Sequence, residues 1–351
     1  MNADWTPLRR VLTTLGHQEP DRVPLLLTLT MHGAKELGLS IQEYYSKPEY
    51  MLEGQLRLYA RYGHDCLMGY AFAGAEMTAW GSEPIYFDDG SPNAGPPVIH
   101  AAKEINALEA PDIGKAPLLQ DMLSLQRGLK ARVGDEVPIV GLVVSPVSLP
   151  VMQMGFPAYI RLLYEDRAAA ERLIRINEAF CVAWAKAQLA AGATVIAYAD
   201  PISSPTMVGR TFFAEVGLPS MRRTLSQIPG PVAVTYASAD SLPLLDRVPE
   251  GGAVAATVGS QEDLAAAKAL CRGRLTVIGN LNNVAMPTWT PEQAEAAVKA
   301  AIAQAGPGGG FVLCDQHGEI PWQTPDEVIQ AIADATRRWG RYPLDWIAHD
   351  Q

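Results

Sequence analysis

Short apolar runs alternate along the chain with longer segments in which apolar residues recur at helical spacing. The short runs are rich in β-branched residues and apolar on both faces, which is typical of strands buried in a parallel sheet. Eight such runs are the number that a closed (β/α)₈ barrel needs, so we expect an α/β protein of the TIM-barrel class. The predicted strands are residues 24–30, 65–70, 138–144, 194–199, 231–236, 253–258, 275–280 and 310–314.

Helical patterns fill the gaps between these runs. The longest is Ala-rich, covers residues 166–191 and is followed by Gly192, which is placed to end it. Because strands and helices alternate over the whole sequence, one barrel accounts for the chain. The predicted helices are residues 48–62, 166–191, 211–227, 262–271, 290–305 and 324–339.

Residues 81–116 break this alternation, since they are rich in Pro, Gly and Asp and show little periodicity. We expect them to form a long excursion over the barrel mouth, so that residues 1–351 make a single domain. In such barrels the active site is built from the loops that follow the strands. Residues directly after each predicted strand are therefore the first candidates for chemistry.

Composition narrows the class of protein. The 351 residues carry a formal net charge of −10, and an acidic chain without a run of Lys and Arg is a poor binder of nucleic acid. The four cysteines are scattered and form no CxxC pair, as expected for reduced thiols in the cytosol. No apolar run is long enough to cross a bilayer, and residues 1–10 lack a signal-peptide core. We expect a cytoplasmic protein with no membrane partner.

Five segments, in order along the chain, carry a family resemblance. They are residues 20–24 (PDRVP), 76–81 (EMTAWG), 191–201 (AGATVIAYADP), 279–281 (GNL) and 317–325 (HGEIPWQTP). With them the chain resembles the uroporphyrinogen decarboxylase superfamily from end to end, and most of all its corrinoid-dependent methyltransferases of the methylcobamide:coenzyme M type. The resemblance implies a TIM barrel that moves a methyl group to or from a corrinoid (cobalamin) cofactor.

The sequence departs from two patterns of that superfamily. Uroporphyrinogen decarboxylases carry an Arg-rich first loop for the substrate's carboxylates, whereas residues 28–33 contain no arginine. The coenzyme M methyltransferases bind zinc through His-x-Cys after strand five and a Cys after strand eight. Here Tyr236, Ala237 and Ser238 stand at the first position, and Cys314 and His317 lie near the second. We therefore expect no tightly held zinc, and the metal ligands are left unassigned.

Four residues near the carboxyl ends of predicted strands are candidate catalytic groups: Glu76, Asp200, Tyr236 and His317. Together they supply carboxylates, a phenol and an imidazole, which can hold a polar methyl donor and protonate its leaving atom. Each also has a structural alternative, such as Asp200 beginning a turn before Pro201 or Tyr236 packing at the barrel rim. The candidate substrate-binding residues are His32, Tyr70, Ser238, Asn280 and Cys314.

The leading functional hypothesis is a methyltransferase that moves a methyl group between a small methylated compound and a corrinoid. The corrinoid is expected on a separate protein, because one barrel uses the whole chain. A decarboxylase acting on a small or porphyrinogen-like acid is the second hypothesis, and a non-catalytic ligand-binding barrel is the third. The methyl donor and acceptor, the direction of transfer and the formation of a homodimer stay open.

Overall fold

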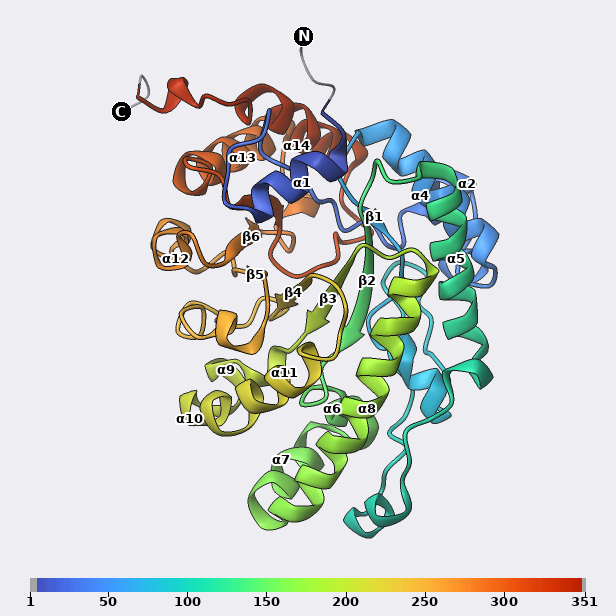
Figure 1. Cartoon of the computed structure of the whole chain (residues 1–351). Helices are drawn as coiled ribbons and strands as arrows, with labels where there is room; N and C mark the ends of the chain where they lie inside the picture. Colours follow the sequence, from blue (N-terminus) through green and yellow to red (C-terminus); the bar gives the residue numbers. More distant parts are fainter. Residues whose placement is uncertain (1–4, 349–351) are drawn as a thin grey trace.

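The computed structural model describes residues 5–348 and shows a single α/β domain in which parallel strands curl into a barrel-like sheet (Figure 1). Seven strands pair in chain order, β1 with β2 and so on to β7. The register is regular, as in the pairing of Val140 with Val195 and of Ile278 with Val312. The expected TIM-barrel class is confirmed. The strands are β1 Leu67–Met68, β2 Ile139–Val144, β3 Val195–Ala199, β4 Val232–Thr235, β5 Ala255–Thr257, β6 Thr276–Leu281 and β7 Phe311–Asp315.

The prediction of a regular strand over residues 24–30 is wrong. Leu25 makes only an isolated parallel bridge to Leu313, although the Leu26 amide donates to the Leu313 carbonyl at 2.9 Å. On the other side the Asp65 amide donates to the Leu25 carbonyl at 2.7 Å, so this segment bridges β7 and the start of β1. Pro24 has no amide to donate, and the Leu29 amide turns back to the Leu27 carbonyl, which ends the ladder early.

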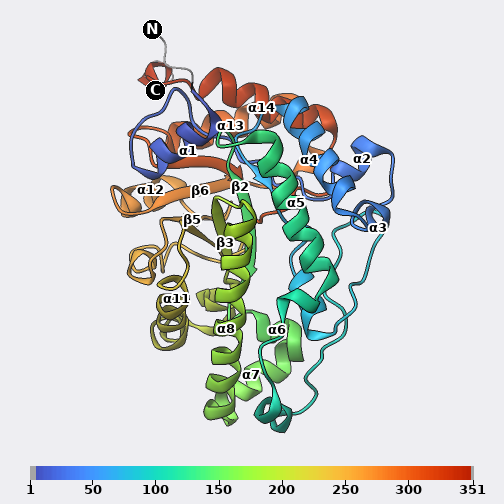
Figure 2. The ribbon, with the colours of Figure 1, turned by 45° about the vertical axis from the view of Figure 1, so that its right-hand side comes forward.

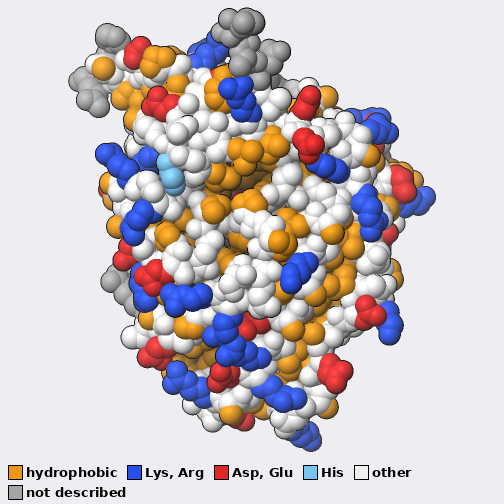
Figure 3. All heavy atoms as spheres, in the orientation of Figure 1, with side chains coloured by type: hydrophobic (Ala, Val, Ile, Leu, Met, Phe, Trp, Pro, Cys, Tyr) orange, Lys and Arg blue, Asp and Glu red, His pale blue; other side chains and the backbone are white. Residues whose placement is uncertain are grey.

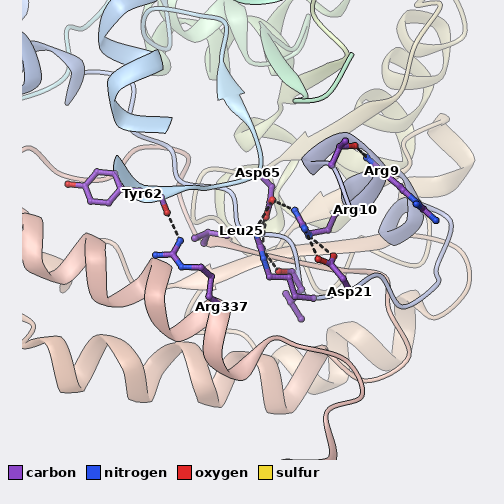
Figure 4. Close-up of polar contacts among 10 residues, drawn as sticks. Arg9, Arg10, Asp21, Leu25, Tyr62, Asp65 and Arg337 are labelled. Carbon is purple, nitrogen blue, oxygen red and sulfur yellow. Dashed lines mark hydrogen bonds and ion pairs between the residues drawn. The ribbon is translucent and has the colours of Figure 1, made fainter. Parts of the chain in front are cut away.

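A buried ion network holds this bridging segment in place (Figure 4). The Asp65 carboxylate, fully buried, accepts from Arg10 at 2.6 Å, from Arg22 at 2.7 and 2.9 Å and from the Leu25 amide at 2.7 Å. Arg10 belongs to helix α1 and also forms a two-point pair with Asp21. One carboxylate therefore ties α1, the bridging segment and the start of β1 together.

Helices cover the outside of the sheet, and α5 lies beside α8 in both views (Figures 1 and 2). The predicted helix 211–227 is interrupted by a π-helical turn at Phe213–Gly217, next to Pro219, which cannot donate to the preceding turn. No helix within residues 5–348 is long and apolar enough to cross a membrane. The helices are α1 Pro7–Leu15, α2 Gly33–Leu37, α3 Ile41–Tyr44, α4 Pro48–Tyr62, α5 Pro117–Val133, α6 Leu149–Met154, α7 Phe156–Glu165, α8 Arg167–Ala191, α9 Pro205–Val208, α10 Arg210–Phe212, α11 Leu218–Leu225, α12 Leu264–Cys271, α13 Pro291–Ala305 and α14 Asp326–Trp339.

The segment 81–116 has two parts with different contacts. Its first part folds back through an antiparallel bridge between Ile85 and Asn93, and the Ser91 hydroxyl donates to Glu319 after β7 at 3.2 Å. Its second part lies along α8, where Arg172 donates to the carbonyls of a short 3₁₀ helix, Ala102–Ala107. The role of this segment as part of one domain, and as a cover of the mouth, stays a prediction.

Candidate functional site

A cavity of about 320 Å³ follows the axis of the barrel. Its lining includes residues that precede strands, such as Pro138 and Pro231, and residues that follow strands, such as Ala237 and His317. The cavity therefore extends from one end of the barrel to the other. We call it the lumen. At the amino ends of the strands it is bounded by α1, and on the face shown in Figure 3 apolar side chains surround a hollow beside this helix.

The carboxyl groups of the lumen lie together where β7 ends. The Asp315 carboxylate is buried, and its Oδ1 accepts the backbone amides of His317 at 2.8 Å and Gly318 at 2.6 Å. Its Oδ2 accepts the Thr28 hydroxyl. With these three donors Asp315 is held in one orientation, and it shapes the turn that follows the strand.

Glu319 is the second carboxylate of this end of the lumen. It accepts the hydroxyls of Thr30 and Ser91, and the surface that it keeps accessible faces the cavity. Burial is the main reason that the pKa of Glu319 rises to about 8, and the charge of Asp315 adds to it. Glu319 therefore carries a proton at neutral pH and can donate it to a bound ligand.

Sequence reasoning missed both carboxylates. The sequence pattern predicts that the last strand ends at Cys314, one residue before Asp315, and it makes His317 the candidate in the loop that follows. The signal was present, because Asp315 and Glu319 flank that histidine in the segment after the strand. Their partners Thr28 and Thr30 come from the opposite end of the chain, which no local pattern reveals.

Three predicted site residues do line the lumen: Tyr70, Cys314 and His317. His317 is exposed at the mouth. Burial, followed by the nearby charges of Glu319 and Asp315, raises the pKa of Tyr70 well above its usual range. Burial and the charge of Asp315 likewise raise the pKa of Cys314, so this thiol stays protonated. These three side chains and the two carboxylates form one group at the carboxyl ends of the strands.

Asp200 and Tyr236 lie near each other but outside the lumen lining. Thr235 and Ala237, on either side of Tyr236, line the lumen, whereas the Tyr236 side chain is fully buried and is not part of that lining. Asp200 is fully buried there, accepts the hydroxyls of Ser145 at 2.6 Å and Ser148 at 3.1 Å, and leaves Oδ2 without a partner. Burial raises the pKa of Asp200 to about 6, against the opposing effect of these hydroxyls. Their catalytic roles stay predictions.

Glu76 is also placed away from the lumen. Both of its carboxylate oxygens accept the Val144 amide at 3.1 Å, at the carboxyl end of β2. Burial raises the pKa of Glu76 to about 8, so it too is protonated at neutral pH. The Glu76 carboxyl group is therefore hydrogen-bonded to the backbone of β2.

The remaining predicted residues occupy three separate places. His32 is buried beside Trp322, and burial followed by the charge of Lys35 lowers its pKa to about 3, so the ring is neutral. Asn280 donates to the Gly259 carbonyl at 3.0 Å. Ser238 is exposed and has a φ of 69°, a left-handed conformation that a residue with a Cβ adopts only under constraint.

The donor set does not fit a zinc site. No group of three or more His, Cys, Asp or Glu side chains that could hold a metal occurs among the described residues. Tyr236 and Ser238 stand where the zinc-binding relatives are expected to carry His and Cys, and a phenol and a hydroxyl are poor zinc ligands.

We expect protein purified without a metal-affinity step to contain far less than stoichiometric zinc, measured by elemental analysis. Incubation with a chelator should leave its melting temperature unchanged. Stoichiometric zinc that disappears in Cys314→Ala or His317→Ala would contradict this and would reveal a different ligand set.

Comparison with known proteins supplies the family. The chain matches uroporphyrinogen decarboxylase (URO-D) over residues 6–339. A methylcobamide:CoM methyltransferase, MtbA of Methanosarcina mazei, is 25% identical over 96% of this chain and 99% of its own length. MtaA of Methanosarcina barkeri is 25% identical over 95% and 98%, and a uroporphyrinogen decarboxylase of Cellvibrio japonicus is 22% identical over 73% and 74%.

Solved structures agree on the fold. A methyltransferase from Methanosarcina mazei superimposes with a TM-score of 0.83 at 20% identity and covers 95% of this chain and 99% of its own. A B12-independent methionine synthase from Shewanella sp. W3-18-1 gives a TM-score of 0.56 at 12% identity, over 88% and 90%. Since the family match extends over nearly the whole sequence, the chain belongs to the uroporphyrinogen decarboxylase family.

Proposed function

We propose that the protein is a corrinoid-dependent methyltransferase that moves a methyl group between a small methylated compound and a cobalamin or corrinoid protein. The observation that carries this proposal is the pair of carboxyl groups, Asp315 and Glu319, that line the lumen at the end of the barrel where enzymes of this fold place their chemistry. Relatedness at low identity to methylcobamide methyltransferases, over nearly the full length, supports the class of reaction.

The corrinoid supplies a strong nucleophile, which leaves the protein the tasks of positioning the donor and controlling a proton. When the bond from the methyl carbon to oxygen, nitrogen or sulfur breaks, the electron pair stays on that atom. Glu319 is placed to neutralise it with its proton, and Tyr70 and His317 line the same end of the lumen. Methyl transfer by this route requires no zinc.

A decarboxylase is the second candidate, because some relatives are uroporphyrinogen decarboxylases. None of the described residues that line the lumen is Lys or Arg, so the carboxylates of an anionic substrate would find no cationic partner there. The electrostatics therefore favour a neutral or cationic methyl donor over a polycarboxylate. A ligand-binding barrel without catalysis is the third candidate, and the assay below distinguishes it.

The test is spectrophotometric. Reduced cobalamin, or a co-purifying corrinoid protein, is incubated with the protein and a panel of neutral O-, N- and S-methyl compounds, and its absorbance is followed. Enzyme-dependent methylation by at least one donor is the expected result. Release of CO₂ from acids without any corrinoid change would favour the decarboxylase, and the absence of both reactions with measurable ligand binding would favour the third candidate.

In this assay His317→Ala should lower the rate by at least about tenfold, because an imidazole at the mouth can orient the donor or relay its proton. His100→Ala serves as the matched control, since His100 is equally exposed but belongs to the segment 81–116, outside the lumen lining. Equal rates in the two variants would remove His317 from the mechanism.

A further inference from the structure

The interior of this barrel is hollow where related architectures are filled. In TIM barrels, layers of bulky branched side chains usually pack the interior. Here β3 lines the cavity with Val195, Ala197 and Ala199, and the lining residues of β4 and β5 include Ala233 and Ala255. Small side chains at these positions leave a lumen of about 320 Å³, which is room for a ligand.

The lumen walls are mostly apolar below the carboxylate end, where Thr194, Thr235 and Thr257 are the polar side chains. Val140 and Leu142 of β2, Ile278 of β6 and Val312 of β7 face it together with the alanines, and Leu12 of α1 bounds it at the far end. A cavity lined in this way does not hold water well, because water needs two or more polar partners. An engineered apolar cavity of about 150 Å³ binds benzene, so this lumen has room for a ligand longer than benzene.

The shape of the lumen limits which ligands fit. Strands rise about 3.3 Å per residue, so the five residues of β3 span roughly 13 Å along the strand and about 11 Å along the barrel axis, to which the strands are tilted. A long and narrow volume suits an extended chain, or a ring that carries a chain. Because none of the described lining residues is cationic, a carboxylate inside the lumen would be unpaired.

We infer that the lumen is a binding site for the apolar body of the methyl donor, an uncharged and elongated alkyl or aryl-alkyl chain, whose methyl-bearing end lies at Asp315 and Glu319. The assignment of the polar end rests on the proposed function. The assignment of the apolar body rests on the alanines and the shape of the lumen, and it can be tested without any corrinoid.

The primary test is calorimetric binding of methyl ethers of increasing chain length, 1-methoxybutane, 1-methoxyhexane and 1-methoxyoctane, to the unmodified protein. Each methylene that enters the lumen should lower Kd about fourfold, as expected for burial of one CH₂ group. A second series, anisole and 4-propylanisole, asks whether a ring enters as well, and the tighter series identifies the preferred body. Affinity that does not change with length in either series would overturn the inference.

Two variants test whether the ethers bind inside the barrel. Ala197→Leu and Ala233→Leu fill the lumen from different strands and should weaken binding of 1-methoxyoctane by at least about tenfold, since the body loses two or more methylenes of space. Ala296→Leu makes the same change on the exposed face of α13 and should bind normally. A melting curve for each variant verifies folding, and unchanged binding in both lumen variants would place the ligand elsewhere.

A charged analogue provides a further check. In 6-methoxyhexanoate the carboxylate ends the chain that should enter the lumen, so this compound should bind at least about tenfold more weakly than 1-methoxyhexane. Equal or tighter binding of the anion would contradict an apolar lumen. If ethers bind as expected but no corrinoid is methylated, the lumen site stands and the proposed function fails. If methanol is as good a donor as every longer ether, the function stands and the lumen site fails.

Discussion

Replacing Glu319 with glutamine should lower the rate of methyl transfer by about 10²–10³-fold, within the range typical of one positioned proton donor. Glutamine keeps the size and accepts one of the two hydroxyls of Thr30 and Ser91 through its oxygen, while its amide nitrogen donates to the other, but it has no transferable proton. The loss should appear in kcat much more than in donor binding, since the proton is required only when the bond to the methyl group breaks.

The pH dependence tests the same group. Because the pKa of Glu319 is about 8, its proton is present below that pH and lost above it, so kcat should fall as pH rises through about 8. Glu319→Gln should abolish this limb of the profile. Glu83→Gln, at an exposed position in segment 81–116, should keep both the rate and the profile. A Glu319→Gln enzyme that retained the same alkaline limb would assign it to another residue.

Stability distinguishes a chemical role from a structural one. A carboxyl group whose pKa rises from 4.5 in the unfolded chain to about 8 in the fold stabilises the fold at low pH, and this contribution is lost as pH rises through about 8. The glutamine variant has no such loss, so above pH 8 it should melt at or above the temperature of the unmodified protein. A lower melting temperature that matched the fall in activity would make Glu319 structural.

Asp65→Ala should lower the free energy of unfolding by about 3–5 kcal/mol, the cost of breaking a buried ion pair by removing one partner. The change leaves Arg22 without its ion partner and the Leu25 amide without its acceptor, while Arg10 keeps Asp21. Urea denaturation followed by circular dichroism measures it.

The control is a solvent-exposed ion pair on the protein surface. Glu53→Ala removes the partner of Arg57 on α4, where both side chains are about half exposed, and it should change the free energy of unfolding by less than about 1 kcal/mol. If Asp65→Ala costs no more than Glu53→Ala, the buried network does not hold the bridging segment.

The class of fold follows from the sequence because buried parallel strands have a recognisable composition, as in Ile139–Val144. The prediction of a regular first strand is wrong because the conformation of residues 24–30 depends on partners far away in the sequence. These partners are Asp65, which accepts the Leu25 amide, and Leu313, which accepts the Leu26 amide. At the site, the ends of the strands could be predicted, but the side from which each side chain projects could not. Tyr236 follows β4 and precedes Ala237, whose φ of 49° departs from the strand conformation, so no pattern of alternation could show that Ala237 lines the lumen and Tyr236 does not.

The bridging segment also bears on the order of assembly. Leu25 lies near the beginning of the chain and its partner Leu313 near the end, so a ribosome releases the first of them long before the second exists. Until then the partly made sheet has an open edge at β1, with unpaired backbone groups that other chains could recruit. Closing the ring is thus a step that the chain completes only after its C-terminal part has emerged, and during synthesis the nascent barrel depends on keeping that edge covered.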